Sequence, residues 1–149
     1  MSQYPLRFLR GLVANSLNEN GRVKAGAVFQ FQRRGGRSDG RREMSINWDD
    51  AEGARVSLVT AVGGESGELK YPEGAVVIDR EEVDRLLVRP ESAGCLAYER
   101  AKIEGNEYHG NVTVAGDADS DTQQIAKSIL QLAIVERLPG ARGRASEPA

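Results

Sequence analysis

The chain of 149 residues holds one cysteine, Cys95, and one histidine, His109. A single cysteine excludes an internal disulfide, so nothing in the sequence indicates an oxidising compartment. One cysteine and one histidine are also too few for an ordinary structural zinc site. The glycine-rich segments match neither a phosphate-binding loop nor a dinucleotide-binding fingerprint. We therefore expect no metal and no cofactor.

Long apolar runs are missing as well. No stretch approaches the roughly 18 apolar residues of a membrane-spanning helix, and Arg7 and Arg10 interrupt the segment in which a signal peptide would carry its apolar core. The 20 basic and 22 acidic residues give a net charge of −2, so no overall field attracts nucleic acid or acidic lipid. Most basic residues are arginines, a bias associated with high-GC bacteria. We expect a bacterial cytoplasmic protein that makes no membrane contact.

Length and composition are those of one globular domain. A content of 40% hydrophobic and 28% charged residues is ordinary for a folded chain. A chain of 149 residues buries enough surface to fold without a metal or a disulfide. We expect a single domain over residues 1–140 and a flexible C-terminal tail over residues 141–149.

Alternation of apolar and polar residues predicts several strands. Phe29 and Phe31 fall on the apolar face of the first such segment, and Trp48 is expected to be a core anchor in the second. The short apolar run before Asp79 is typical of a central strand that is covered on both sides. Residues 5–17 fit a helix or a strand equally well. The predicted strands cover residues 22–32, 44–48, 54–62, 74–78, 94–100 and 108–115.

Two segments carry helix-capping signals. Asp79 followed by Glu82 predicts the start of a short helix. Ser120 with Gln123 has the spacing of a capping box and starts a longer amphipathic helix that continues to Pro139. Together these elements predict an α+β fold. It consists of a mostly antiparallel sheet of five or six strands, a C-terminal amphipathic helix packed on one face, and one short additional helix.

His109 is the sharpest catalytic candidate, because histidine is the side chain that titrates near neutral pH without help. In a strand, His109, Asn111 and Thr113 share one face. A neighbouring strand would bring Glu99 near His109 as its partner in general acid–base catalysis. The alternative is a solvent-facing histidine on a sheet, with Gly110 marking a bulge or a close backbone approach. We favour this plainer alternative.

The sequence bears on two further kinds of site, a cysteine nucleophile and a calcium-binding loop. Cys95 has the chemistry of a nucleophile paired with His109, but a cysteine inside a strand is more typical of a small buried hydrophobe. Asp117, Asp119 and Asp121 have the spacing that opens a calcium-binding loop, yet the later glycine and glutamate positions of such a loop hold other residues. Helix capping is the role that we expect for these acids.

A glycine-rich loop between the first two predicted strands concentrates positive charge. A flexible loop of this kind is able to clamp phosphates. The loop has no interleaved aromatic residue on which a base would stack, and Asp39 and Glu43 dilute its charge. We therefore favour a role in solubility over nucleic-acid binding for this loop. The candidate binding residues are Arg33, Arg34, Arg37, Arg41 and Arg42.

Two functional hypotheses follow. The first, which we favour, is a non-enzymatic adaptor or protein-binding module that acts through its sheet face or its polar loops, on a protein partner or by self-association. The second is a small hydrolase or nuclease. It would use His109 as general acid–base, a carboxylate such as Glu99 or Glu107, and the arginine loop for phosphate contact.

Overall fold

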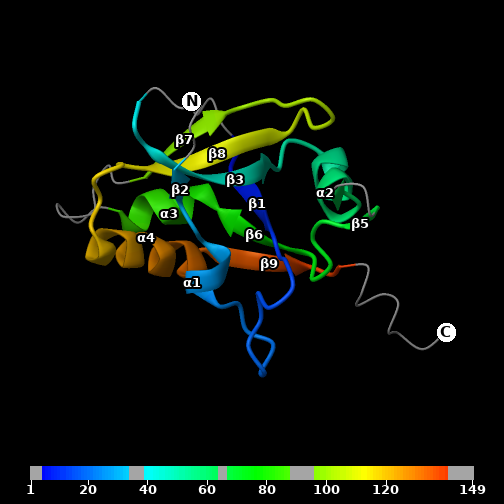
Figure 1. Cartoon of the computed structure of the whole chain (residues 1–149), viewed down its shortest axis with the longest axis horizontal. Coiled ribbons are helices and arrows are strands. Elements are labelled where there is room, and N and C mark those ends of the chain that lie inside the picture. The colour runs from blue at the N-terminus through cyan, green and yellow to red at the C-terminus, as the bar shows by residue number, and fades with distance from the viewer. Residues whose placement is uncertain (1–4, 34–38, 64–66, 88–95, 141–149) are drawn as a thin grey trace.

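An antiparallel sheet of seven strands forms the middle of the molecule (Figure 1). The computed structural model describes residues 5–33, 39–63, 67–87 and 96–140. The strands of the main sheet are β1 (Arg7–Gly11), β2 (Gln32–Arg33), β3 (Arg42–Trp48), β6 (Ala75–Asp79), β7 (Leu96–Arg100), β8 (His109–Val114) and β9 (Ile134–Leu138). They lie in the order β7-β8-β3-β1-β6-β9, and β2 pairs with β3 beside this path. A separate hairpin consists of β4 (Val62–Gly63) and β5 (Glu68–Leu69).

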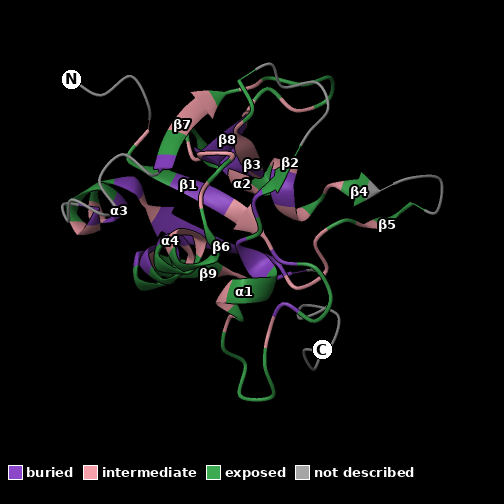
Figure 2. Ribbon diagram, turned by 60° about the vertical axis from the view of Figure 1, so that its left-hand side comes forward, coloured by how far each residue is buried: buried purple, intermediate pink, exposed green. Residues whose placement is uncertain are grey.

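Helices pack on both faces of the sheet, because its central strands are apolar on both sides. The helices are α1 (Ala25–Val28), α2 (Glu52–Val59), α3 (Arg80–Leu86) and α4 (Ser120–Leu132). We call the side of α1, α3 and α4 the first face, and the side of α2 the second face. In β1, Phe8 belongs to the large core of the first face and Leu9 to a smaller cluster on the second. Figure 2 shows that the buried residues gather in the sheet and on the sides of the helices that face it.

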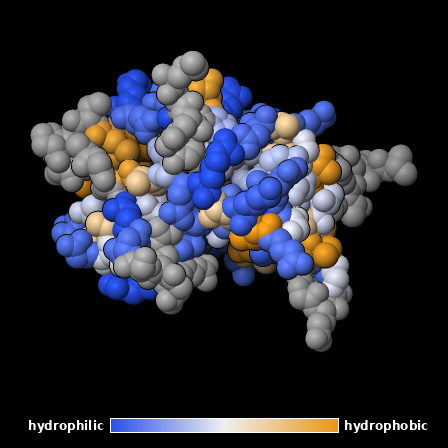
Figure 3. Space-filling model, turned by 90° about the horizontal axis from the view of Figure 1, so that it is seen from above, coloured by the Kyte–Doolittle hydropathy of each residue, from blue (hydrophilic) through white to orange (hydrophobic). Residues whose placement is uncertain are grey.

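Exposed large apolar side chains are spread over the surface. In the view of Figure 3 they form small, separate patches among hydrophilic residues. Among the described residues, no helix combines the length and the apolar character that crossing a membrane requires.

The expected α+β class and the mostly antiparallel sheet are confirmed. Residues 5–17, which the pattern left open, contain β1. The predicted helix start at Asp79 is confirmed, since this side chain accepts a hydrogen bond from the backbone N–H of Glu81 at 3.1 Å. Trp48 is confirmed as a core anchor: it is fully buried, and its ring lies edge-on to Phe8 and Tyr98 with both centroids at 5.8 Å.

The strand predicted over residues 22–32 is wrong for most of its length. The segment forms the short helix α1 and then joins the sheet only as β2. The reason is that Val28 and Phe29, adjacent in the chain, are both buried in the core of the first face. A strand would have pointed them to opposite faces.

The strand predicted over residues 54–62 is also wrong, because Glu52–Val59 is the helix α2. The residues that pack are Ala54 and Leu58, four positions apart on one helix face, whereas Val56 is largely exposed. The apolar residues at every second position have the spacing of a strand, but only those at helical spacing face the sheet.

The C-terminal helix is shorter than predicted. It ends at Leu132, and Ile134–Leu138 forms the edge strand β9 on β6. Leu132, the last residue of the helix, is 71% exposed. The N-cap is Asp119 rather than Ser120, since the Asp119 carboxylate accepts a hydrogen bond from the backbone N–H of Thr122 at 2.8 Å.

Gly110 lies directly against the Trp48 indole. The indole Nε1–H donates a hydrogen bond to the backbone oxygen of Glu99 at 3.2 Å. A Cβ atom on Gly110 would lie 2.3 Å from this Nε1 and 2.5 Å from the same oxygen. The close backbone approach predicted at Gly110 is therefore confirmed.

Candidate functional site

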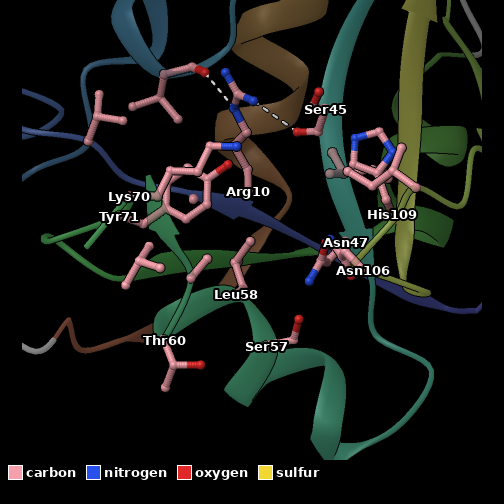
Figure 4. Close-up of a pocket in the computed structure, with 18 of the residues that line it drawn as sticks. Arg10, Ser45, Asn47, Ser57, Leu58, Thr60, Lys70, Tyr71, Asn106 and His109 are labelled. Atoms are coloured by element: carbon pink, nitrogen blue, oxygen red, sulfur yellow. Dashed lines mark hydrogen bonds between the residues drawn. The ribbon is translucent and has the colours of Figure 1, made fainter. Parts of the chain in front are cut away.

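A groove lies on the second face of the sheet, where β1 and β3 separate. The two strands pair only at Phe8–Trp48 and Leu9–Asn47, and beyond Leu9 the strand β1 pairs with β6 alone. The gap opens into a hollow of ≈810 Å³ bounded by α1, α2, the β4–β5 hairpin and the 103–106 turn (Figure 4). A second hollow of ≈450 Å³ continues from it along the 102–108 segment. The two share the lining residues Ser57, Ile103, Glu104, Gly105 and Asn106, and together we call them the groove.

Arg10 occupies the gap between the separated strands. Its Nε donates a hydrogen bond to the carbonyl oxygen of Val28 and its Nη1 to that of Ser45, each at 2.9 Å (Figure 4). These bonds join α1 to β3 across the opening. Arg10 therefore holds the two walls at a fixed separation at this end of the groove.

Asn47 fixes the opposite wall. Its Nδ2 donates to the backbone oxygen of Ala54 at 3.1 Å, which ties β3 to α2. Its Oδ1 accepts from the Asn106 side chain at 2.7 Å, which ties β3 to the turn. Because Asn47 is buried, these bonds are shielded from water and hold the floor of the groove in place.

Arg55 holds the outer side of α2. It donates to both carboxylate oxygens of Asp49, at 2.9 and 3.2 Å, and to Glu136 of β9 at 3.1 and 3.2 Å. The hydrogen bond with Asp49 is the largest cause that raises the pKa of Arg55 above its ordinary value. This network links α2 to the last strand of the sheet.

The rim of the groove combines apolar and polar side chains. Its exposed lining residues include Val13, Thr60, Val62, Lys70, Ile103 and Glu104. Tyr71 lies across Gly11, where a Cβ atom would come within 2.3 Å of the ring. The Nζ of Lys70 lies 5.7 Å from the centroid of the same ring.

His109 lines the groove beside Ser45 (Figure 4). Its Nδ1 lies 2.7 Å from the backbone oxygen of Ala101. A carbonyl oxygen only accepts hydrogen bonds, so in the neutral ring Nδ1 carries the hydrogen and Nε2 is left as an acceptor. Within the described part of the chain, neither Nε2 nor the Ser45 hydroxyl has a hydrogen-bond partner.

Glu99 and Asn111 lie together on the same face as His109. β7 and β8 are neighbours, as the acid–base hypothesis required, but Glu99 stands opposite Asn111 and not opposite His109. The Asn111 Nδ2 donates to Glu99 Oε2 at 2.7 Å. Asn111 is 3% exposed, and its Oδ1 has no hydrogen-bond partner among the described residues. A catalytic role for these three residues stays a prediction.

The arginine loop lies at another end of the sheet. Arg33 and Arg42 donate to the backbone oxygen of Gly116, and Arg41 donates to the hydroxyl and the backbone oxygen of Thr113. These bonds tie the base of the loop to the end of β8. Arg34 and Arg37 lie outside the described residues. No arginine of this loop that the structure describes lines the groove.

The aspartates with the calcium-loop spacing, Asp117, Asp119 and Asp121, do not line the groove. Cys95 falls outside the described residues, as does the predicted tail over 141–149. The capping role expected of the aspartates is confirmed at Asp119, where the hydrogen bond from the Thr122 backbone lowers the pKa of the carboxyl. Within the described residues, no three histidine, cysteine, aspartate or glutamate side chains are grouped to hold a metal ion.

Sequence reasoning missed four residues that shape the groove. Arg10 did carry a signal, since it interrupts an apolar alternation in the first strand. Ser45 and Asn47 form the polar half of an alternating strand, a pattern typical of a solvent-facing side. Tyr71 carried no signal, because its position over the first strand depends on a contact between distant segments.

Comparison of the chain with protein-family models, with curated proteins and with solved structures finds no match. A functional assignment therefore depends on the geometry and chemistry of the groove.

Proposed function

We propose that this protein is a non-enzymatic binding module that holds a short, extended segment of a partner protein in the groove. The observation that carries the proposal is that exposed apolar side chains and hydrogen-bonding groups line the same groove. A peptide presents apolar side chains and amide groups at short intervals, so it complements both kinds of lining. The hollow of ≈810 Å³ lies within the usual range for ligand sites, about 300–1,000 Å³, and the second hollow lengthens it.

The hydrogen bonds of the candidate catalytic residues support a binding role. The Nδ1 of His109 is held by a backbone oxygen, and the Glu99 carboxylate is held by Asn111. A binding module needs no imidazole–carboxylate pair, whereas the acid–base hypothesis needs one. The proposal keeps the expectation that the protein is bacterial and cytoplasmic.

A small hydrolase or nuclease is the second candidate. One observation favours it: His109 lines the groove, and its Nε2 has no hydrogen-bond partner among the described residues. Under this alternative the wild type cleaves a bound peptide or oligonucleotide, and His109→Ala abolishes cleavage. Intact ligand recovered after prolonged incubation with the wild type would reject it.

The test of the binding proposal is selection of ligands from a random 12-residue peptide library. The selected peptides are then titrated against the wild type and two variants by fluorescence polarisation. Val62→Asp puts a charge on the groove rim. Val135→Asp is the matched control, because Val135 also lies in a strand and is similarly exposed, 48% against 60%, but does not line the groove.

We expect Val62→Asp to weaken binding at least ten-fold and Val135→Asp to leave it within two-fold of the wild type, since a charge at an apolar contact is costly only where the ligand covers it. Recovery of no binding peptide from the library would count against the proposal. So would peptides that lose affinity on Val135→Asp and keep it on Val62→Asp.

A further inference from the structure

We infer that Ser45, His109 and Asn111 form a subsite for a primary carboxamide, the side chain of a glutamine in the bound segment. This inference deepens the proposed function and rests on it. Ser45 of β3 stands directly opposite Asn111 of β8 in the strand register, and His109 is two positions away on the same strand. Side chains placed in this way on one sheet face are about 4.5–8 Å apart at their Cβ atoms, within reach of one small group.

Asn111 supplies the first acceptor. Its Nδ2 donates to Glu99, which fixes the orientation of the amide, because the reverse orientation would set the Asn111 oxygen against a carboxylate. The atom that remains, Oδ1, is buried and has no partner among the residues that the structure describes. A buried acceptor in this state is destabilising until a donor reaches it. A ligand N–H that arrives there supplies the missing hydrogen bond.

His109 supplies the second acceptor and Ser45 the donor. Nε2 of His109 accepts because Nδ1 is committed to the Ala101 oxygen. The Ser45 hydroxyl is without a partner and turns freely about its C–O bond. Both residues line the groove, whereas Asn111 does not and its Oδ1 is covered, so a ligand group reaches that oxygen only when the side chains over it move aside. The depth of Asn111 favours glutamine, whose side chain carries the amide one methylene further than that of asparagine.

The hydrogen-bonding groups of this subsite match those of a carboxamide. Two acceptors and one hydroxyl donor complement the two N–H groups and one carbonyl oxygen of –CO–NH₂. A carboxylate of the same shape would place an acceptor oxygen, in place of the NH₂ group, against Asn111 and His109. An ammonium group could donate to all three residues, so its exclusion depends on charge.

The charges on either side also favour a neutral, dipolar group. The Glu99 carboxylate lies behind Asn111, toward which the ligand N–H groups point. The Arg10 guanidinium is bonded to the backbone carbonyl of Ser45, which places its positive charge on the β3 side of the subsite. An anion would approach Glu99 and a cation would approach Arg10, whereas the amide dipole is aligned with both.

The direct test is a titration with propionamide, which reproduces the end of a glutamine side chain. His109 is the only histidine, so its ring C–H signals in an NMR spectrum report on this subsite without assignment of other residues. Propionate and propylammonium are the matched charged probes. We expect saturable shifts with propionamide, with a Kd of roughly 10–100 mM for so small a ligand, and binding at least ten-fold weaker for either charged probe.

Ser45→Ala removes the hydroxyl donor and should weaken propionamide binding at least three-fold. This variant is preferred to a change at Asn111, whose burial would make folding part of the outcome. Ser128→Ala, an exposed serine on α4 outside the groove, is the control and should bind as the wild type does. In peptides selected for groove binding, replacing glutamine with glutamate should lower affinity at least ten-fold.

Two results would overturn the inference: equal binding of propionamide and propionate, or no loss on Ser45→Ala. If peptides still bind and respond to Val62→Asp in that case, the proposed function stands without the subsite. If propionamide binds as described but no peptide is recovered, the carboxamide subsite stands and the protein-binding proposal fails.

Discussion

Replacing Gly110 with alanine tests the packing beneath the groove. The added Cβ atom would lie 2.3 Å from Trp48 Nε1 and 2.5 Å from the Glu99 backbone oxygen. Trp48 is fully buried between Phe8 and Tyr98, so the indole has no free space into which to move. Overpacking of a core costs about 1–3 kcal/mol, and loss of the indole hydrogen bond adds about 1 kcal/mol. We expect Gly110→Ala to lower the free energy of unfolding by about 2–4 kcal/mol.

Urea denaturation followed by tryptophan fluorescence measures this loss, because Trp48 is the only tryptophan. Gly26→Ala is the matched control. Gly26 lies in α1, is exposed, and would have nothing within 4 Å of an added Cβ atom. Alanine there should stabilise the helix by about 0.5–1 kcal/mol. A Gly110→Ala protein within about 0.5 kcal/mol of the wild type would refute the packing argument, since an overpacked core costs more than that.

The helix cap at Asp119 and the ion pairs of Arg55 give further predictions. The hydrogen bond from Thr122 lowers the pKa of Asp119 in the folded state. The cap therefore stabilises the fold fully above the unfolded pKa, about 3.9, and this stabilisation is lost as the pH falls through the folded pKa. Asp119→Asn keeps a cap but does not titrate, so its melting temperature should fall less on acidification than that of the wild type; parallel pH profiles would contradict this. Arg55→Met removes the bonds to Asp49 and Glu136 and should destabilise the protein by about 1 kcal/mol in urea unfolding, since exposed ion pairs contribute little singly. Molar NaCl should shrink that loss, and a loss independent of salt would point to packing instead.

Local signals in the sequence predicted the elements that depend on local chemistry. The apolar run Ala75–Ile78 marked a strand buried on both sides, and Asp79 marked the helix that follows it. The errors arose where one pattern fits two structures. Residues 54–62 carry apolar side chains at every second position, yet Ala54 and Leu58 alone pack, and they do so at helical spacing.

The candidate site was only partly predictable, because the groove is produced by long-range arrangement. The chemistry of the side chains identified His109, Glu99 and Asn111 as candidates. The pairing of β7 with β8 does bring these residues to one face of the sheet. The separation of β1 from β3 has no local signature, since it depends on where β6 and β3 align with β1. Without that separation, Ser45 has the pattern of an ordinary strand residue, and the interruption at Arg10 does not indicate a groove.

The strand order has a consequence for how the chain reaches its native state. Only β2–β3 and β7–β8 join strands that follow one another in the sequence, and every other pairing of the main sheet connects distant segments. Chains of such high contact order fold slowly, on a scale of roughly milliseconds to seconds. During synthesis β6 gains its outer neighbour only after β9, the last strand described, has left the ribosome. Until then an apolar strand is left with an open edge, and such an intermediate is prone to aggregate unless a chaperone shields it.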